Sequence, residues 1–247
     1  MDFRLVEVED SLDFFDVIEC QWQSYENPLQ NFFRMFCPVR GEGDAARVAS
    51  LRESASRQWE WHTSDPASHW FKVVDPLGKI AGACLWKIYT SNPFGKAGDH
   101  SEAYWYPEGE AREYVTKSLE QFDAPRRRLA TRPQVYLNII YTHPDFRRQG
   151  VANVMLAWGK QKADEMGVEM WLDATKYGVP VYQKHGFIVV EENPVRPKKE
   201  DPGETWIKTE QALQPMVFWS MWRPVRGMYE EGKTVKPWEA EASCVAR

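Results

Sequence analysis

The stretch YTHPDFRRQGVA, residues 141–152, decides the fold because it joins an apolar run to an amphipathic one. Residues 135–141 predict a strand, and apolar side chains at 151, 154, 155 and 158 predict a helix over residues 150–166. The first N–H groups of such a helix have no intrahelical acceptor and carry the positive end of its dipole. The loop can therefore hold a pyrophosphate, and the small residues Gly150 and Ala152 leave room for it.

Outward from this stretch, the sequence predicts strands that alternate with helices. Downstream we expect strands over 168–173, 187–191 and 215–222, with a short helix over 179–185. Upstream we expect a strand over 3–8, a helix over 13–25 capped by Ser11, a short helical piece over 29–35 and a helix over 44–62 capped by Asp44. Residues 70–75 and 79–90 predict a hairpin, in which Gly82 indicates a bulge or a close approach.

A change of composition between residues 91 and 133 predicts an insertion between strands. A loop with Pro and Gly opens it, a charged helix is expected over about 108–122, and three arginines at 126–128 close it. Such an insertion is either a solvated surface excursion or a lid over a substrate site. We expect one domain over 1–225, with the insertion at about 91–133 and a motif core at about 134–192, and then a C-terminal tail over 226–247.

Charge and composition narrow the classes of function. Lys and Arg number 31 against 36 Asp and Glu, and this net charge of -5 offers no positive field to a nucleic-acid backbone. No apolar run approaches the roughly 18 residues of a membrane span, and the start lacks the features of a secretion signal. We therefore expect a cytoplasmic protein without nucleic-acid or membrane partners. The cysteines, at 20, 37, 84 and 244, match neither a zinc spacing nor a disulfide framework, so no metal site is expected.

Two sequence blocks together resemble a known family. The first is the loop, in which residues 147–152 follow the pattern [Q/R]-x-x-G-x-[G/A]; the second is WLDAT at 171–175 followed by GVPVYQKHGF at 178–187. Their order and spacing resemble the GNAT superfamily of acyl-CoA N-acyltransferases over about residues 136–191. THPDF at 142–146, the Trp158-Gly159 pair and the Ala163-Asp164 pair are similar to a fungal-type branch of small-molecule GNAT proteins.

The resemblance implies a fold, a co-substrate and binding residues. The implied fold is α/β (α+β), a single domain with a mixed, mostly antiparallel twisted sheet flanked by helices on both faces. The implied co-substrate is acetyl-CoA. The main chain of Ile140, Tyr141 and Thr142 would pair with its pantetheine arm. Arg147 stands at the Q/R position, and the pyrophosphate would contact the amides of Arg148, Gln149, Gly150, Val151, Ala152 and Asn153.

Acyl transfer from a thioester to an amine also needs catalytic groups. Tyr182 matches the family tyrosine near the CoA sulfur, and a phenol with a pKa of about 10 can protonate a thiolate whose conjugate acid has a pKa of about 8.5. The general base is either Asp173 or a water reached through Asn138 or Tyr136. Asp173 could instead cap a helix or support the site, and His143 is expected to be structural, as is His185. The family mechanism is direct attack in a ternary complex, so no cysteine is needed as a nucleophile.

The expected acceptor is a primary amine on a small molecule; the alternatives are that the protein is a protein or peptide N-acetyltransferase, or a non-catalytic acyl-CoA-binding module. Residues 227–234 match the spacing of a nucleotide-binding P-loop, G-x-x-x-x-G-K-[ST]. Pro237 follows too soon for the helix that a P-loop requires, and two glutamates in the loop would repel phosphate. We expect no nucleotide site there.

Overall fold

The computed structural model describes residues 2–94 and 102–239. Its backbone contacts divide the chain into two compact units, residues 1–88 with 136–162 and residues 89–135 with 163–247. Part of the loop that opens the predicted insertion, with Gly95 and Gly98, lies outside the described residues, as does Cys244. Among the described helices, none combines the length and the apolar character needed to cross a membrane.

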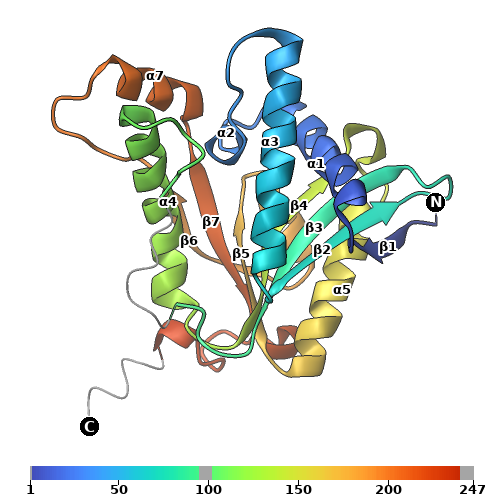
Figure 1. Cartoon of the computed structure of the whole chain (residues 1–247). Coiled ribbons are helices and arrows are strands. Elements are labelled where there is room, and N and C mark those ends of the chain that lie inside the picture. The colour runs from blue at the N-terminus through green and yellow to red at the C-terminus, as the bar shows by residue number, and fades with distance from the viewer. Residues whose placement is uncertain (1, 95–101, 240–247) are drawn as a thin grey trace. The chain divides into compact units, whose positions relative to one another are not determined.

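The first unit holds strands β1 (Arg4–Glu7), β2 (Ser68–Val74), β3 (Ile80–Tyr89) and β4 (Gln134–Thr142), in that order. The pairs β1–β2 and β2–β3 are antiparallel. The helices are α1 (Ser11–Glu26), α2 (Phe33–Phe36), α3 (Gly43–Ser64) and α5 (Val151–Met166). Figure 1 shows α1 and α3 side by side over β2 and β3.

Side chains that alternate along β2 show that helices cover both faces of this unit. Trp70 meets Phe14 of α1 edge to face, with ring centroids 5.3 Å apart, whereas the next residue, Phe71, meets Trp158 of α5 at 4.2 Å. Successive side chains of a strand point to opposite faces. The helices α1 and α5 therefore lie on opposite sides of the strands.

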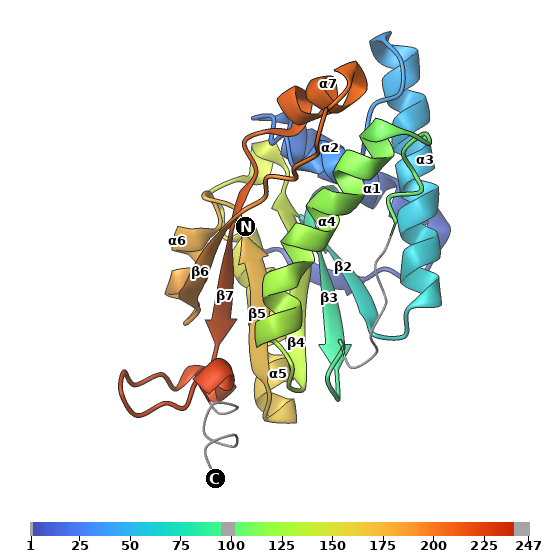
Figure 2. The same ribbon diagram turned by 90° about the vertical axis from the view of Figure 1, so that its left-hand side faces the viewer.

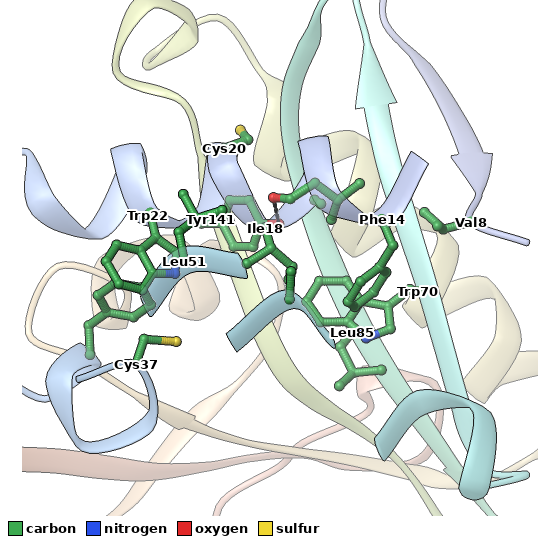
Figure 3. Packing of buried hydrophobic residues seen from close by; sticks show 14 residues of the cluster. Val8, Phe14, Ile18, Cys20, Trp22, Cys37, Leu51, Trp70, Leu85 and Tyr141 are labelled. Atoms are coloured by element: carbon green, nitrogen blue, oxygen red, sulfur yellow. Dashed lines mark hydrogen bonds between the residues drawn. The ribbon is translucent and has the colours of Figure 1, made fainter. Parts of the chain in front are cut away.

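The core of the first unit is built around α1 (Figure 3). Phe14, Ile18 and Trp22 are buried along one side of this helix, at helical spacing. The indole Nε1 of Trp22 donates to Ser54 Oγ at 3.0 Å, so this buried polar atom is satisfied. Burying each such side chain contributes about 1.5–3 kcal/mol, and α1 is thereby fixed on the sheet.

Three predicted details of this unit are wrong. The N-cap of α1 is Asp10 and not Ser11, because the Asp10 carboxylate accepts the N–H groups of Leu12 and Asp13, both at 2.9 Å. The helix α3 begins at Gly43 without a side-chain cap, so Asp44 lies inside its first turn, where a negative charge favours the dipole. The short piece expected over 29–35 is helical only over 33–36.

The second unit holds β5 (Glu169–Ala174), β6 (Ile188–Pro194) and β7 (Val217–Arg223). β7 lies between the other two and is antiparallel to both, as Figure 2 shows. Its helices are α4 (Glu110–Leu129), α6 (Val179–Lys184) and α7 (Glu204–Leu213). The α/β class with mostly antiparallel strands is confirmed in both units.

The helices α4 and α7 depart from the predictions. The helix α4 continues through Pro125 to Leu129, beyond its expected end near residue 122, because Phe122 packs on Phe218 with ring centroids 4.6 Å apart and the last turn carries three arginines that favour the dipole. The helix α7 was not predicted. Its first N–H groups, of Gly203 and Trp206, donate to the Glu110 carboxylate of α4 at 3.0 and 3.2 Å. Because Glu110 is distant from α7 in the sequence, the residues around α7 do not reveal this cap.

Candidate functional site

The predicted pyrophosphate loop follows β4 and leads into α5. At its start, the N–H of His143 donates to Ala81 O of β3 at 2.9 Å, and His143 Nδ1 accepts the N–H of Asp145 at 3.2 Å, which caps a short 3₁₀ turn over Pro144–Phe146. At its end Gly150 has φ of 92°, a left-handed conformation that favours glycine. The glycine therefore allows the sharp turn that starts α5.

Hydrogen bonds fasten this loop to α1. Arg147 Nη2 donates to Ser24 O at 2.9 Å, and His143 Nε2 lies 2.6 Å from Gln23 Oε1. The hydroxyl of Tyr25 donates to Ile140 O at 3.0 Å. The side chains of Arg147 and His143 thus hold the loop against α1.

The first hydrogen bonds of α5 identify which amides are used inside the protein. Gly150 O accepts the N–H of Asn153 at 2.9 Å and that of Val154 at 3.3 Å. The amide of Asn153, predicted to contact pyrophosphate, is therefore engaged within the helix. The amides of residues 149–152 precede these bonds, and those of Val151 and Ala152 lie in the first turn of α5, which lacks intrahelical acceptors. Val151 is buried.

The strand residues predicted for the pantetheine arm differ in their burial and in their hydrogen bonds. Tyr141 is buried, and its hydroxyl donates to Val17 O at 2.6 Å. Ile140 and Thr142 are only partly buried. Because Ile140 O already accepts the Tyr25 hydroxyl, a ligand amide that pairs there would share or replace this bond.

Tyr182, the predicted acid, lies on α6 in the second unit. Its ring meets Phe187 edge to face, with centroids 6.0 Å apart, and the residue is 8% exposed. Helical side chains lean toward the helix start, and the ring accordingly lies over Gly178. A Cβ at Gly178 would lie 2.5 Å from Tyr182 Cε2 and 3.3 Å from its hydroxyl oxygen. A glycine at this position therefore makes room for the phenol.

Asp173, the candidate base on β5, is held by protein groups. Its side chain is 3% exposed; Oδ1 accepts the Ser220 hydroxyl at 2.7 Å, and Oδ2 lies 3.4 Å from Arg126 Nε. Ser220 Oγ in turn accepts from Asn193 Nδ2 at 2.9 Å. The carboxylate thus links β5 to β7, β6 and α4, an arrangement that favours its alternative role as a structural support. Sequence reasoning missed this network because its members are far apart in the chain.

The insertion helix α4 packs as part of the second unit. Tyr114 and Val115 are buried, the Tyr114 ring lies 4.9 Å from that of Trp206, and Arg126 pairs with Asp173 and Asp123. The helix therefore has a buried face and is not a wholly solvated excursion.

The cysteines and the P-loop-like segment are the remaining features noted in the sequence. Burial raises the pKa of Cys20 and of Cys37 to about 12, and it raises that of Cys84 further, so these thiols are protonated at neutral pH. In the P-loop-like segment, Lys233 Nζ pairs with Glu230 at 2.5 Å and Thr234 Oγ1 accepts the Glu230 N–H at 2.7 Å. Both side chains thus contact the segment itself. No group of His, Cys, Asp or Glu within residues 2–94 and 102–239 could hold a metal ion.

The predicted residues divide between the two units. Ile140 to Asn153 lie in the first, and Asp173 and Tyr182 in the second. Within its own unit, each set is fixed by the contacts described above.

Comparisons with known proteins give a family match and several structural likenesses. Residues 127–198 match the model of the acetyltransferase (GNAT) domain. The arylalkylamine N-acetyltransferase 2 of Aedes aegypti is similar at 17% identity and a TM-score of 0.59, over 91% of this chain and 99% of that one. The polyamine N-acetyltransferase of Drosophila melanogaster is similar at 13% identity and a TM-score of 0.60, over 91% of this chain and all of that one.

A third structure is described as histone acetyltransferase HPA2 and related acetyltransferase, from Corynebacterium glutamicum. It is 17% identical with a TM-score of 0.55, over 94% of this chain and 99% of that one. No curated protein sequence matches the chain. At these identities the likenesses establish the fold, and the family match covers residues 127–198. The chain therefore has the GNAT fold, and its match to the GNAT acetyltransferase domain over residues 127–198 identifies it as an acyltransferase.

Proposed function

We propose that this acyltransferase moves an acetyl group from acetyl-CoA to a primary amine of a small molecule. The main support is the loop into α5, where Gly150 with φ of 92° turns the chain so that the first amides of a helix follow directly. Such amides bind phosphate groups without specific side chains, and GNAT enzymes use acetyl-CoA. In this proposal the amides of residues 148–152 take the pyrophosphate and the main chain of residues 140–142 takes the pantetheine arm.

Arg147 has a supporting role in this proposal. Its guanidinium donates to Ser24 O of α1 and so holds the loop against α1. Asn153 contributes its side chain rather than its amide, because that amide donates to Gly150 O. We propose one functional domain over 1–225, and the cytoplasmic location and fungal-type branch remain predictions from the sequence.

The chemistry is direct attack in a ternary complex. The amine nitrogen forms a bond to the thioester carbonyl carbon, giving a tetrahedral oxyanion that a main-chain N–H at the end of β4 stabilises. The C–S bond then breaks, and the Tyr182 hydroxyl gives its proton to the departing thiolate. The amine proton leaves through a general base. Because both Asp173 oxygens already contact Ser220 and Arg126, a water reached through the exposed Asn138 is the better base.

Two of the similar structures are named as arylalkylamine and polyamine N-acetyltransferases, which supports a small amine acceptor. The test is a screen with acetyl-CoA and three acceptor classes: arylalkylamines, polyamines and peptides with a free α-amine. Released thiol measures turnover, and mass spectrometry identifies the acetylated product. We expect turnover with a small amine. Turnover with peptides alone would favour the protein N-acetyltransferase, and acetyl-CoA binding without turnover would favour the binding module. A protein that does not bind acetyl-CoA would contradict the proposal entirely.

A further inference from the structure

Gly82 of β3 lies against both ends of the loop that joins β4 to α5. A Cβ built on it would lie 2.5 Å from Tyr141 O, 3.2 Å from Thr142 Cα and 3.0 Å from Val151 Cγ1. The first two atoms belong to the last residues of β4, and the third belongs to the first residue of α5. One position of β3 thus touches the chain just before the loop and just after it.

Gly82 supplies room, and its backbone conformation does not itself require glycine. Its φ lies outside the left-handed region, in contrast to that of Gly150, so an L-residue could adopt the same backbone. A carbonyl oxygen and a Cα atom cannot rotate out of the way as a side-chain end can. A methyl group at residue 82 would therefore separate β3 from β4 or from α5.

The neighbouring residue ties β3 to the loop itself. Ala81 O accepts the N–H of His143, the first loop residue, at 2.9 Å. Ala81 also lies at a bulge, because Val73 pairs with Gly82 whereas Val74 pairs with Ile80. The bulge and the glycine therefore occur together where β3 meets the loop.

We propose that Gly82 is a positioning residue for the cofactor loop. Its missing side chain sets the separation between the end of β4 and the start of α5, and so places the main-chain groups of both for acetyl-CoA. This inference rests on the proposed function, which assigns acetyl-CoA to residues 140–142 and 148–152. Gly82 itself touches no substrate.

Gly82→Ala tests the inference directly. We expect its Kd and KM for acetyl-CoA to rise about tenfold to 100-fold, because misplaced binding groups are costly. We expect kcat at saturating acetyl-CoA and KM for the amine to stay within about threefold of wild type, since the loop binds the co-substrate rather than the acceptor. Ala83→Gly is the matched control: it weakens the same strand by removing a buried methyl, and its Kd for acetyl-CoA should not change.

Val151→Ile crowds the contact between Gly82 and Val151 from the side of α5. It tests the inference even if Gly82→Ala does not fold. It enlarges the side chain whose Cγ1 faces Gly82, and we expect weaker acetyl-CoA binding. Val154→Ile, the same change elsewhere on α5, should bind as wild type does. Wild-type affinity in Val151→Ile and in any folded Gly82→Ala protein would overturn the inference while leaving the proposed function intact. Failure of the wild-type protein to bind acetyl-CoA would instead contradict the proposed function.

Discussion

The loop between β4 and α5 and the β5–α6 segment are held in different ways. The loop is fixed by local turns, by bonds to α1 and by a glycine of β3, and in the proposed function it binds acetyl-CoA through its main chain. The β5–α6 segment presents the side chains of Asp173 and Tyr182, and Asp173 is held by residues of α4 and β7. The turn of the loop is set within the loop by Gly150, although distant residues anchor it, whereas the Asp173 carboxylate is held by distant partners alone.

The largest expected effect is the loss of acetyl-CoA binding at the loop between β4 and α5. Gly150→Glu should abolish saturable acetyl-CoA binding, because it places bulk and negative charge against the pyrophosphate. Gly150→Ala is the control for backbone strain, since any side chain at a φ of 92° is strained. We expect the alanine variant to bind acetyl-CoA about tenfold more weakly at most, a modest effect of strain. Calorimetric titration measures both, and equal affinities of a folded Gly150→Glu and the wild type would exclude the loop as the cofactor site.

The next effect separates binding from chemistry. Tyr182→Phe keeps the ring that packs on Phe187 and removes only the hydroxyl. We expect kcat and kcat/KM to fall together by a factor of about 10² to 10⁴, the range for one positioned acid, with an unchanged Kd for acetyl-CoA. Steady-state kinetics with the best acceptor, beside Tm, measure this. If chemistry limits the rate and the folded variant stays within about threefold of wild type, far below that range, another group is the acid.

A smaller effect on rate tests the role of Asp173. Asp173→Asn should lower the free energy of unfolding by about 1–3 kcal/mol, because the buried network with Ser220 and Arg126 loses its charge. Its kcat should stay within about threefold of wild type, whereas loss of a general base would cost about 10² or more. Urea unfolding and the pH–rate profile distinguish the two roles. Loss of the acidic limb of the profile would establish Asp173 as the base.

The difference between local and distant contacts also explains which elements the sequence predicts well. Strand β4 was expected over 135–141 and spans 134–142, and the helix expected over 150–166 spans 151–166. Their apolar periodicity and turn residues are local. The helix α7 was missed because Glu110 of another helix caps it, and the partners of Asp173 could not be found because Arg126 and Ser220 are distant in sequence. Local patterns therefore predict the elements on either side of the proposed cofactor loop, while tertiary packing decides the surroundings of the proposed catalytic side chains.

The smallest expected effect concerns the pH dependence of the loop. Burial lowers the pKa of His143 below its ordinary value of 6.5; Asp145 opposes this, and Lys79 and Arg147 add to it. Neutral His143 accepts the Asp145 N–H at Nδ1 and faces Gln23 Oε1 with Nε2. Protonation of Nδ1 removes that acceptor. The unfolded chain therefore binds the proton more strongly than the folded chain, and stability decreases as the pH falls from about 6.5 toward the folded pKa.

His143→Asn isolates this effect, because asparagine can accept the same N–H but does not titrate. Between pH 7.5 and 5.5 we expect the Tm of the wild type to fall a few degrees more than that of the variant, with nearly equal values at pH 7.5, where His143 is neutral in both states. The other histidines are common to both proteins, so their titration cancels in the difference. Acetyl-CoA affinity should weaken over the same pH range in the wild type and less in the variant, because His143 holds the start of the loop against β3 and α1. Parallel changes of Tm in the two proteins would show that the loop does not depend on a neutral histidine.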